Sequence, residues 1–451
     1  MSYAAAVDQL NRMVPELHTS PGDLRRKFSL DEIRVLLEAL GNPQRDFPAV
    51  LIAGTNGKGS TAATLASILT ASGIRTGLYT SPHLVRANER IRIDREEITD
   101  DAFARLYFRV HDAAQQLVDT GALPQHASFF EVLTAQALLH FAQEKVDVAI
   151  LEVGMGGRLD ATNIVDPLLS VITDISLDHT EWLGSTIAAI AREKAGILRR
   201  NGVLVTLPQH PEANQAIGEV AVDLEVRGVN AAEYMPHLGV PDSGSYAVEA
   251  LGASVVVDSP LTGAHQHRNL ALAIATAVEL ATHHHFPITP QSLEEGIRET
   301  RWPARLERIT TDGVEWILDV AHNPAGAWAL RAGLNAAFSS GVPSRTLIFS
   351  CLRDKPLTEM AQILFPLFDQ VILAPIHSAR AASMEDLLAA AQVTGTPAVV
   401  ASSVREALQM AAHGVDAGKE RTPIPAATVV ISGSVYLVGE ARGLLLPGAK
   451  P

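Results

Sequence analysis

The organisation of the chain follows from residues 50–61, which read Val-Leu-Ile-Ala-Gly-Thr-Asn-Gly-Lys-Gly-Ser-Thr. The apolar run at the start predicts a buried strand, the glycines predict a tight turn, and residues 62–71 predict a helix. Glycines in such a turn let backbone N–H groups converge on phosphate oxygens, and the start of a helix adds the positive end of its dipole. The stretch therefore predicts a phosphate-binding loop between a strand and a helix.

Within this loop, Lys58 is placed to neutralise the β- and γ-phosphates of a nucleotide, and Ser60 or Thr61 offers a hydroxyl to Mg²⁺. A common P-loop has Ser or Thr directly after its lysine, whereas Gly59 intervenes here. The alternative is a Gly-rich turn with a solvated lysine. Because loop, lysine, hydroxyls and strand–helix context coincide, we favour a site for nucleotide phosphates. Its predicted residues are Gly54, Thr55, Asn56, Gly57, Lys58, Gly59 and Ser60.

The composition is that of a globular protein with a sizeable core. The chain has 451 residues, enough for two or three domains, with 47% hydrophobic and 19% charged residues. A net charge of −14 argues against a general nucleic-acid binder and against docking to an anionic membrane. Cys351 is the single cysteine, so no internal disulfide forms. With no secretory signal in residues 1–13 and no apolar run long enough to span a bilayer, we expect a cytoplasmic protein.

The first two thirds of the chain alternate between apolar strands and helices. Buried strands are predicted at residues 76–80, 146–151, 168–173 and 203–206. Helical spacing predicts helices within 24–40 and at 100–118, 129–143, 186–197, 265–280 and 292–298. Residues 208–260 have weaker signals, and we expect a β-rich edge region there. The three histidines at 283–285 are expected to form a surface turn rather than a metal site, since adjacent side chains cannot all face one ion.

Polar side chains follow several of these strands, where ligands usually lie in an α/β domain. Glu152 ends one strand and fits a carboxylate that holds Mg²⁺ opposite a phosphate loop. Ser81, at the end of another strand, is either a ligand or a turn former. His179 is either a ligand or a structural histidine.

A second α/β pattern begins after Arg301-Trp302-Pro303, so we expect one domain at residues 1–300 and another at 301–451. Strands are predicted at 314–318, 346–350, 370–373, 398–401 and 428–431, with helices between them. The expected fold is α/β with two domains: an N-terminal P-loop ATPase-like parallel-sheet domain and a smaller, Rossmann-like C-terminal domain. Polar residues at 319–323, 354–355, 378–380 and 432–434 follow strands of the second sheet. Arg380, Ser378 and Ser434 are candidates for binding an amino acid, and a solvated rim is the alternative.

Together the motifs resemble folylpolyglutamate synthase/dihydrofolate synthase, of the Mur ligase superfamily. The resemblance extends from about residue 24 to about residue 440. It rests on the segments 54–60 (GTNGKGS), 81–84 (SPHL), 152–163 (EVGMGGRLDATN), 178–180 (DHT), 193–197 (EKAGI) and 319–324 (DVAHNP).

The resemblance implies roles for individual residues. Magnesium is expected at Ser81, Glu152 and His179, and a carbamylated Lys194 is expected to help bind a second magnesium. His322 is expected near the reacting phosphate. The other residues expected to contact ATP are Asn269, Arg305 and Asp319. Those expected to hold the pteroate moiety are Phe28, Ser29, Ser128, Phe129, Phe130, Glu131, Leu159, Asp160 and Ala161. Relatives often read Asp-Leu-Gly where this chain has Lys-Phe-Ser at 27–29, which leaves open whether dihydropteroate or only a glutamylated folate binds.

The implied activity is ligation of L-glutamate to dihydropteroate or to reduced folates, driven by ATP with Mg²⁺ through an acyl phosphate, by a monomer. His322 is a candidate base or charge stabiliser, or else a helix-start histidine bonded to the backbone. For both Lys194 and Arg305 the alternative is a surface ion pair. The rival functions are a peptidoglycan Mur ligase acting on a UDP-sugar peptide, and a P-loop switch without ligase activity. The second α/β domain argues against the switch.

Overall fold

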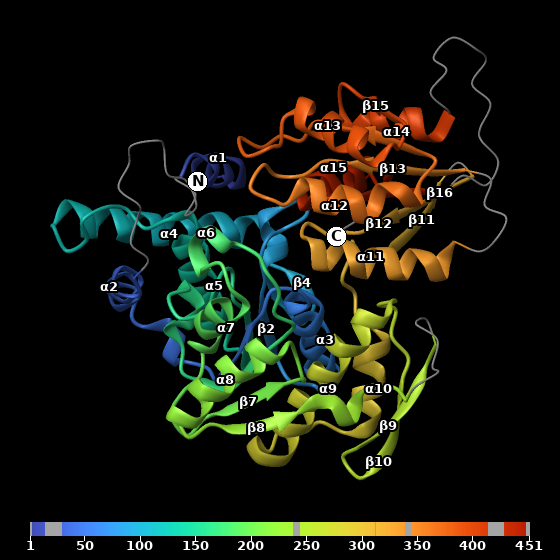
Figure 1. Cartoon of the computed structure of the whole chain (residues 1–451). Helices are drawn as coiled ribbons and strands as arrows, with labels where there is room; N and C mark the ends of the chain where they lie inside the picture. Colours follow the sequence, from blue (N-terminus) through green and yellow to red (C-terminus); the bar gives the residue numbers. More distant parts are fainter. Residues whose placement is uncertain are drawn as a thin grey trace.

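The computed structural model describes residues 2–13, 29–237, 244–311, 313–338, 344–413 and 428–447. Two α/β lobes, each built around its own sheet, lie one above the other in Figure 1. The segment 301–306 leads from one lobe to the other. The expected fold class, a parallel-sheet N-terminal domain followed by a smaller α/β domain, is confirmed.

The first sheet has eight strands in the order β4-β3-β2-β5-β1-β6-β7-β8. The strands from β2 to β8 in this order are parallel, and β3 and β4 form an antiparallel edge. Their bounds are β1 Ala49–Ala53, β2 Thr76–Tyr79, β3 Ile91–Ile93, β4 Glu96–Glu97, β5 Val148–Glu152, β6 Pro167–Ile172, β7 Val203–Thr206 and β8 Arg227–Asn230. The phosphate loop follows β1, which lies at the centre between β5 and β6.

Both faces of this sheet are buried, as the continuous apolar runs predict. Val50 and Ile52 of β1 belong to one core, whereas Leu51 between them belongs to the other. The first core is covered by α3 Lys58–Ala71, α9 Ala264–His284, α10 Pro290–Arg298 and the hairpin β9 Tyr246–Ala250 with β10 Ala253–Val257. The second is covered by α1 Tyr3–Arg12, α2 Asp31–Ala39, α4 Asp100–Asp119, α5 Phe129–Glu144, α6 Thr180–Leu183, α7 Ile187–Ala195 and α8 Pro211–Asp223.

The second sheet has six strands in the order β11-β12-β16-β13-β14-β15, all parallel except β11. Their bounds are β11 Glu307–Thr311, β12 Val314–Leu318, β13 Arg345–Phe349, β14 Gln370–Leu373, β15 Ala398–Val400 and β16 Thr428–Ser432. The helices on its two faces are α11 Pro324–Ala337, α12 Leu357–Leu364, α13 Met384–Thr394, α14 Val404–His413 and α15 Val435–Leu445. Short 3₁₀ helices are η1 Pro43–Arg45, η2 Ala87–Arg90, η3 Ala161–Ile164, η4 Ala231–Tyr234 and η5 Phe365–Leu367.

The expectation of a β-rich region at 208–260 is wrong in its first part. Residues 211–223 form α8, which begins with Pro211 after the capping side chain of His210. Proline fits the first turn of a helix because its missing N–H would be unpaired there. Ala213, Ala216 and Ile217 give α8 its buried face. The histidines at 283–285 end α9, the last of them in a left-handed conformation. In the described part of the chain, no helix is both long and apolar enough to cross a membrane.

Candidate functional site

The phosphate loop turns sharply between β1 and α3. Gly54 and Gly57 have φ angles of 155° and 90°. A Cβ on Gly54 would lie 1.8 Å from Thr173 Oγ1, and one on Gly57 would lie 2.1 Å from Asn269 Oδ1. Both positions therefore require glycine, and the second brings the predicted nucleotide contact Asn269, on α9, directly against the loop.

The loop is only partly free to bind phosphate through its backbone. The N–H groups of Thr55 and Asn56 donate to the carbonyl oxygen of Asp174, at 2.8 and 3.2 Å. The N–H groups of Lys58, Gly59 and Ser60 lie in the first turn of α3, where a helix provides no internal acceptor. These first-turn groups are therefore the better candidates for phosphate oxygens.

The lysine of the loop is folded back over it. Lys58 Nζ donates to the carbonyl oxygens of Gly54 and Thr55, at 3.2 and 3.1 Å. These are neutral acceptors that an arriving anion would readily replace. Gly59 packs beneath Trp302, since a Cβ there would lie 2.8 Å from the indole ring.

Two predicted metal ligands meet beside the loop. Glu152 ends β5, next to β1 in the sheet, and its Oε2 accepts from the backbone N–H of Ser81 at 3.2 Å. Burial raises the pKa of Glu152, against the opposing effect of Lys58. His179, with φ of 50°, lies at the start of α6, and burial lowers its pKa to about 4. Its ring is therefore neutral at pH 7, with a lone pair available.

Lys194 lies inside the N-terminal lobe and not in a surface ion pair. Its residue is 4% exposed and its Nζ donates to the carbonyl oxygen of Gly54 at 2.7 Å. Burial, followed by the nearby charge of Lys58, lowers the pKa of Lys194 to about 7. A large fraction of this amine is neutral at pH 7, which is what reaction with carbon dioxide requires.

The C-terminal lobe places a cation and an acid at the start of its sheet. Arg305 is half-buried and donates to the carbonyl oxygen of Ala304 at 3.0 Å, and it forms no surface ion pair in the described residues. Asp319 follows β12 and accepts from the backbone N–H groups of Leu306 and Ala321, at 3.0 and 2.9 Å. Burial raises the pKa of Asp319, opposed first by Arg305. The opposite charges of Arg305 and Asp319 therefore attract one another where the second lobe begins.

A polar network joins the two lobes, centred on Asp178. Its Oδ1 accepts from Lys355 Nζ at 2.6 Å, and its Oδ2 accepts from Asn323 Nδ2 at 3.0 Å. Asn323 also donates to Asn56 Oδ1 in the phosphate loop at 3.0 Å. Burial opposes the charge of Asp178, but His179, Lys355 and His322 together hold its pKa well below the usual value.

His322 belongs to the same network. Its Nδ1 lies 2.8 Å from the carbonyl oxygen of Val320, which only accepts, so we place the ring proton on Nδ1. Nε2 then carries the lone pair and lies 3.8 Å from Asp178 Oδ2. Burial lowers the pKa of His322 to about 4, so the ring is neutral at pH 7. His322 is thus bonded to the backbone through Nδ1, as the alternative expected, and its Nε2 can still accept a proton.

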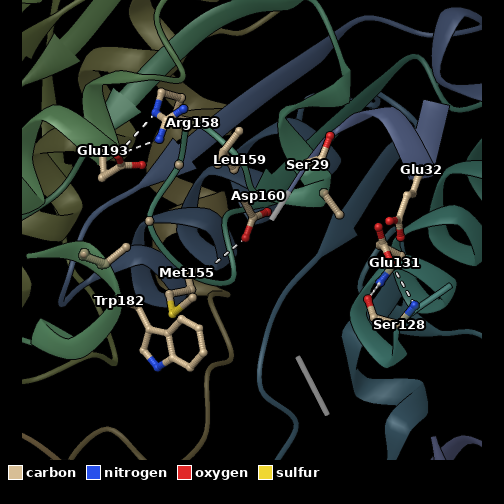
Figure 2. A pocket seen from close by; sticks show the side chains of 14 residues that line it. Ser29, Glu32, Ser128, Glu131, Met155, Arg158, Leu159, Asp160, Trp182 and Glu193 are labelled. Carbon is tan, nitrogen blue, oxygen red and sulfur yellow. Dashed lines mark hydrogen bonds and ion pairs between the residues drawn. The ribbon is translucent and has the colours of Figure 1, made fainter. Parts of the chain in front are cut away.

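The predicted substrate residues come together in one pocket beside this site. Figure 2 shows Ser29, Ser128 and Glu131 on one side and Trp182 on the other. The lining residues are Ser29, Glu32, Ser128, Glu131, Met155, Gly156, Gly157, Arg158, Leu159, Asp160, Ala161, Trp182, Leu183 and Glu193. Six of the nine predicted residues are among them, and these six come from three separate segments of the chain.

The other three predicted substrate residues lie elsewhere. Phe28 is outside the described residues. Phe129 starts α5 beneath the guanidinium of Arg90, and Phe130 packs behind the pocket, where a Cβ on Gly154 would lie 2.6 Å from its ring.

Arg380, a candidate for binding an amino acid, forms an ion pair with Asp354 at 2.7 Å.

Asp160 orders the pocket loop. Its carboxylate accepts from the backbone N–H groups of Met155 and Thr162, at 2.9 and 3.0 Å. Burial raises its pKa, against these hydrogen bonds. The side chain therefore holds two ends of the Gly-rich loop together rather than pointing freely into the pocket (Figure 2).

Residues 52–277 match the Mur ligase middle domain, and residues 304–435 match the glutamate ligase domain of Mur ligases. Folylpolyglutamate synthase of Lacticaseibacillus casei is 36% identical, over 99% of this chain and all of that protein. Dihydrofolate synthase/folylpolyglutamate synthase of Mycobacterium tuberculosis is 35% identical, over 96% of this chain and 92% of that protein.

Solved structures agree with the sequence comparisons. Folylpolyglutamate synthase of Mycobacterium tuberculosis, in complex with ADP and AMPPCP, superposes with a TM-score of 0.86 at 33% identity over both whole chains. An FPGS–AMPPCP–folate complex superposes with a TM-score of 0.81 at 33% identity, over 99% of this chain and all of that one. The chain therefore belongs to the folylpolyglutamate synthase/dihydrofolate synthase family of Mur ligases, which are ATP-dependent, ADP-forming ligases.

Proposed function

We propose that the enzyme adds L-glutamate to dihydropteroate, to folyl-(poly)glutamates, or to both, with release of ADP and phosphate. One observation carries the proposal: a phosphate loop, two metal-ligand candidates and a substrate pocket lie at the same edge of one sheet. Across from them, the second lobe presents Arg305, Asp319 and His322. This is the arrangement needed to hold a nucleotide between two lobes while an acid approaches it.

The pocket supports a pterin-like acceptor. Trp182, Met155 and Leu159 supply apolar and aromatic surface for a flat ring. Carboxylates at Glu32 and Glu131 supply hydrogen-bond acceptors at the same place. A pterin ring carries amino and ring N–H donors, which such acceptors recognise. The folate in a solved complex of a relative is consistent with this assignment.

The first chemical step is transfer of the γ-phosphoryl group of ATP to the acceptor carboxylate. Two anions must approach one another, so their charge must be neutralised. Lys58 supplies one cation, and the first-turn N–H groups of α3 supply aligned dipoles. Arg305 and Asp319, with Asn269 behind the loop, are proposed to hold the nucleotide between the lobes.

The donors beside the loop fit magnesium. Glu152 offers a buried carboxylate and Ser81 a hydroxyl, which are the hard oxygen ligands that Mg²⁺ prefers, and His179 adds a neutral nitrogen. No group of three or more His, Cys, Asp or Glu side chains placed to hold a metal occurs in the described ranges. Mg²⁺ at nucleotide sites usually takes one or two protein ligands, and substrate phosphates and water supply the rest. When bound, the ion would screen phosphate charge.

The second step is attack of the glutamate amine on the acyl phosphate. The amine must lose a proton to form the amide, and His322 Nε2 carries a lone pair that faces the interlobe network. We assign His322 the role of proton acceptor or charge stabiliser there. We also assign Lys194, once carbamylated, to a second metal position, because a carbamate replaces a buried cation with oxygen ligands.

Product analysis tests the proposal. Dihydropteroate and tetrahydrofolate are offered separately with ATP, Mg²⁺ and labelled glutamate, and ADP release and product mass are followed. We expect ADP release that requires both glutamate and a pterin acceptor. ATP hydrolysis that is independent of both, with no labelled product, would refute ligase activity. The domain boundary at residue 301, a monomeric state and a cytoplasmic location remain part of this proposal and rest on the sequence.

A further inference from the structure

A buried guanidinium lies between the pocket and the metal-ligand candidates. Arg90 ends η2 and its residue is only 7% exposed. Its Nε donates to His83 Nδ1 at 2.8 Å, and its Cζ lies 5.3 Å from the ring centroid of Phe129. Because Nδ1 accepts this hydrogen bond, it carries no proton, so the His83 ring is neutral. Arg90 therefore keeps its positive charge against a neutral ring on one side and an aromatic face on the other.

No acid forms an ion pair with Arg90 in any described part of the chain. The adjacent Glu89 is not available, because its carboxylate accepts from the backbone N–H groups of Leu84, Val85 and Arg86. A buried cation without a directly paired carboxylate is costly, and the charges of Glu152 and Glu89 offset that cost only from a distance. An anion supplied by a ligand would remove that cost.

The surroundings indicate which anion this is. Phe129, beneath the guanidinium, is the first residue of α5, and the helix cap before it, Ser128, lines the pocket. On the other side, Glu152 and its hydrogen-bond partner Ser81 lie close enough for the Glu152 charge to act on Arg90. Arg90 therefore stands between the pocket, which is rich in acids, and the place where phosphate is proposed to bind. If a pterin ring binds among these acids, the carboxylate at the other end of the substrate would lie near Arg90.

We propose that Arg90 binds the acceptor carboxylate that becomes phosphorylated, holding it for attack on the γ-phosphate. The proposal rests on the proposed function and adds to it a residue that recognises the reacting acid. The guanidinium offers two N–H groups side by side, a geometry that matches a carboxylate. Its charge also reduces repulsion between the carboxylate and the phosphate as they approach.

Binding measurements with Arg90→Met test the proposal directly. Pteroic acid and its carboxamide, which lacks the charge but keeps the ring, are titrated calorimetrically into wild type and variant in the presence of Mg²⁺ and AMPPCP. We expect the variant to bind pteroic acid about 10- to 100-fold more weakly, from loss of a charge-assisted contact, and the carboxamide equally well. Equal weakening of both ligands would overturn the proposal, as would weaker binding of AMPPCP alone.

Arg92→Met is the matched control for stability. Arg92 is also 7% exposed, but it pairs with Glu97 at 3.5 Å and packs over Trp302. We expect Arg92→Met to lower the melting temperature, because it leaves Glu97 without this partner, and Arg90→Met to leave it unchanged or raise it. A large fall for Arg90→Met would assign the guanidinium a structural role and overturn the proposal. If wild type binds neither pteroic acid nor tetrahydrofolate, the proposed function fails instead, and the two outcomes are distinct.

Discussion

Lys194 gives the most quantitative prediction, because its environment determines how readily it is modified. The residue is 4% exposed and its pKa is lowered to about 7 by burial and by Lys58. About half of the amine is then neutral at pH 7, against about one part in 3,000 for a lysine of ordinary pKa. Only the neutral amine reacts with carbon dioxide, so we expect efficient carbamylation here. Lys194→Ala is expected to reduce turnover at least 100-fold, since the second metal position loses its oxygen ligand.

Two measurements check this chemistry. With ¹³C-labelled bicarbonate, a carbamate resonance is expected in wild type and not in Lys194→Ala. In buffer freed of carbon dioxide, activity should fall and then recover when bicarbonate is added. As pH drops below about 7, Lys194 becomes protonated, so the bicarbonate requirement should increase on the acid side. Unchanged activity of wild type without carbon dioxide, or of Lys194→Ala in any buffer, would refute the role.

The same pKa also predicts an effect on stability. The folded state disfavours the charged amine, so the unfolded chain binds more protons between about pH 10.5 and pH 7, and stability falls as pH drops through that window. Below about pH 7 the cost is complete and constant, with an upper bound of about 5 kcal/mol. At pH 7, Lys194→Met should therefore unfold at a higher denaturant concentration than unmodified wild type while being inactive. A marked loss of stability would contradict the lowered pKa.

Three further substitutions separate the parts of the site. Gly57→Ala should abolish AMPPCP binding, because its Cβ would lie 2.1 Å from an amide oxygen on α9; Gly73→Ala, also at positive φ but with open space around it, should bind normally in the same titration. Lys355→Met should lower the free energy of unfolding in urea by about 3–5 kcal/mol and reduce kcat, because it leaves Asp178 buried without its closest cation. Asp160→Asn should raise KM for the pterin acceptor about 10-fold or more while leaving KM for ATP unchanged, since it places a donor where the loop N–H groups need an acceptor.

Much of the fold was predictable because both sheets are buried on both faces. Their strands are apolar runs bounded by turn-forming residues, as at 49–53 and 148–152. The loop after β1 was predictable because its glycines are required by backbone conformation and close packing. Helix α8 was missed because its buried face is built from small residues, Ala213 and Ala216, with a single larger one, Ile217. Such a face gives a weak helical period.

The interlobe network could not be predicted in the same way. Lys355 and Asp178 are 177 residues apart, and Asn323 reaches Asn56 across 267 residues. Each follows a strand, which places it at an edge of its own sheet, but no local pattern indicates how two sheets face one another. Arg90 was missed for a different reason: an arginine directly before a short strand looks like a solvated edge residue until its burial is known.

The ionisable groups of this site share a physical signature. Burial raises the pKa of the acids Glu152 and Asp319 and lowers the pKa of the bases Lys194 and His322. In each case the charged form is disfavoured, so these groups reduce stability and are explained by chemistry rather than by folding. Asp178 differs, because the surrounding cationic and imidazole groups outweigh the effect of burial and hold its pKa low. We therefore infer that Asp178 maintains the contact between the lobes, whereas the shifted groups around it meet the substrates.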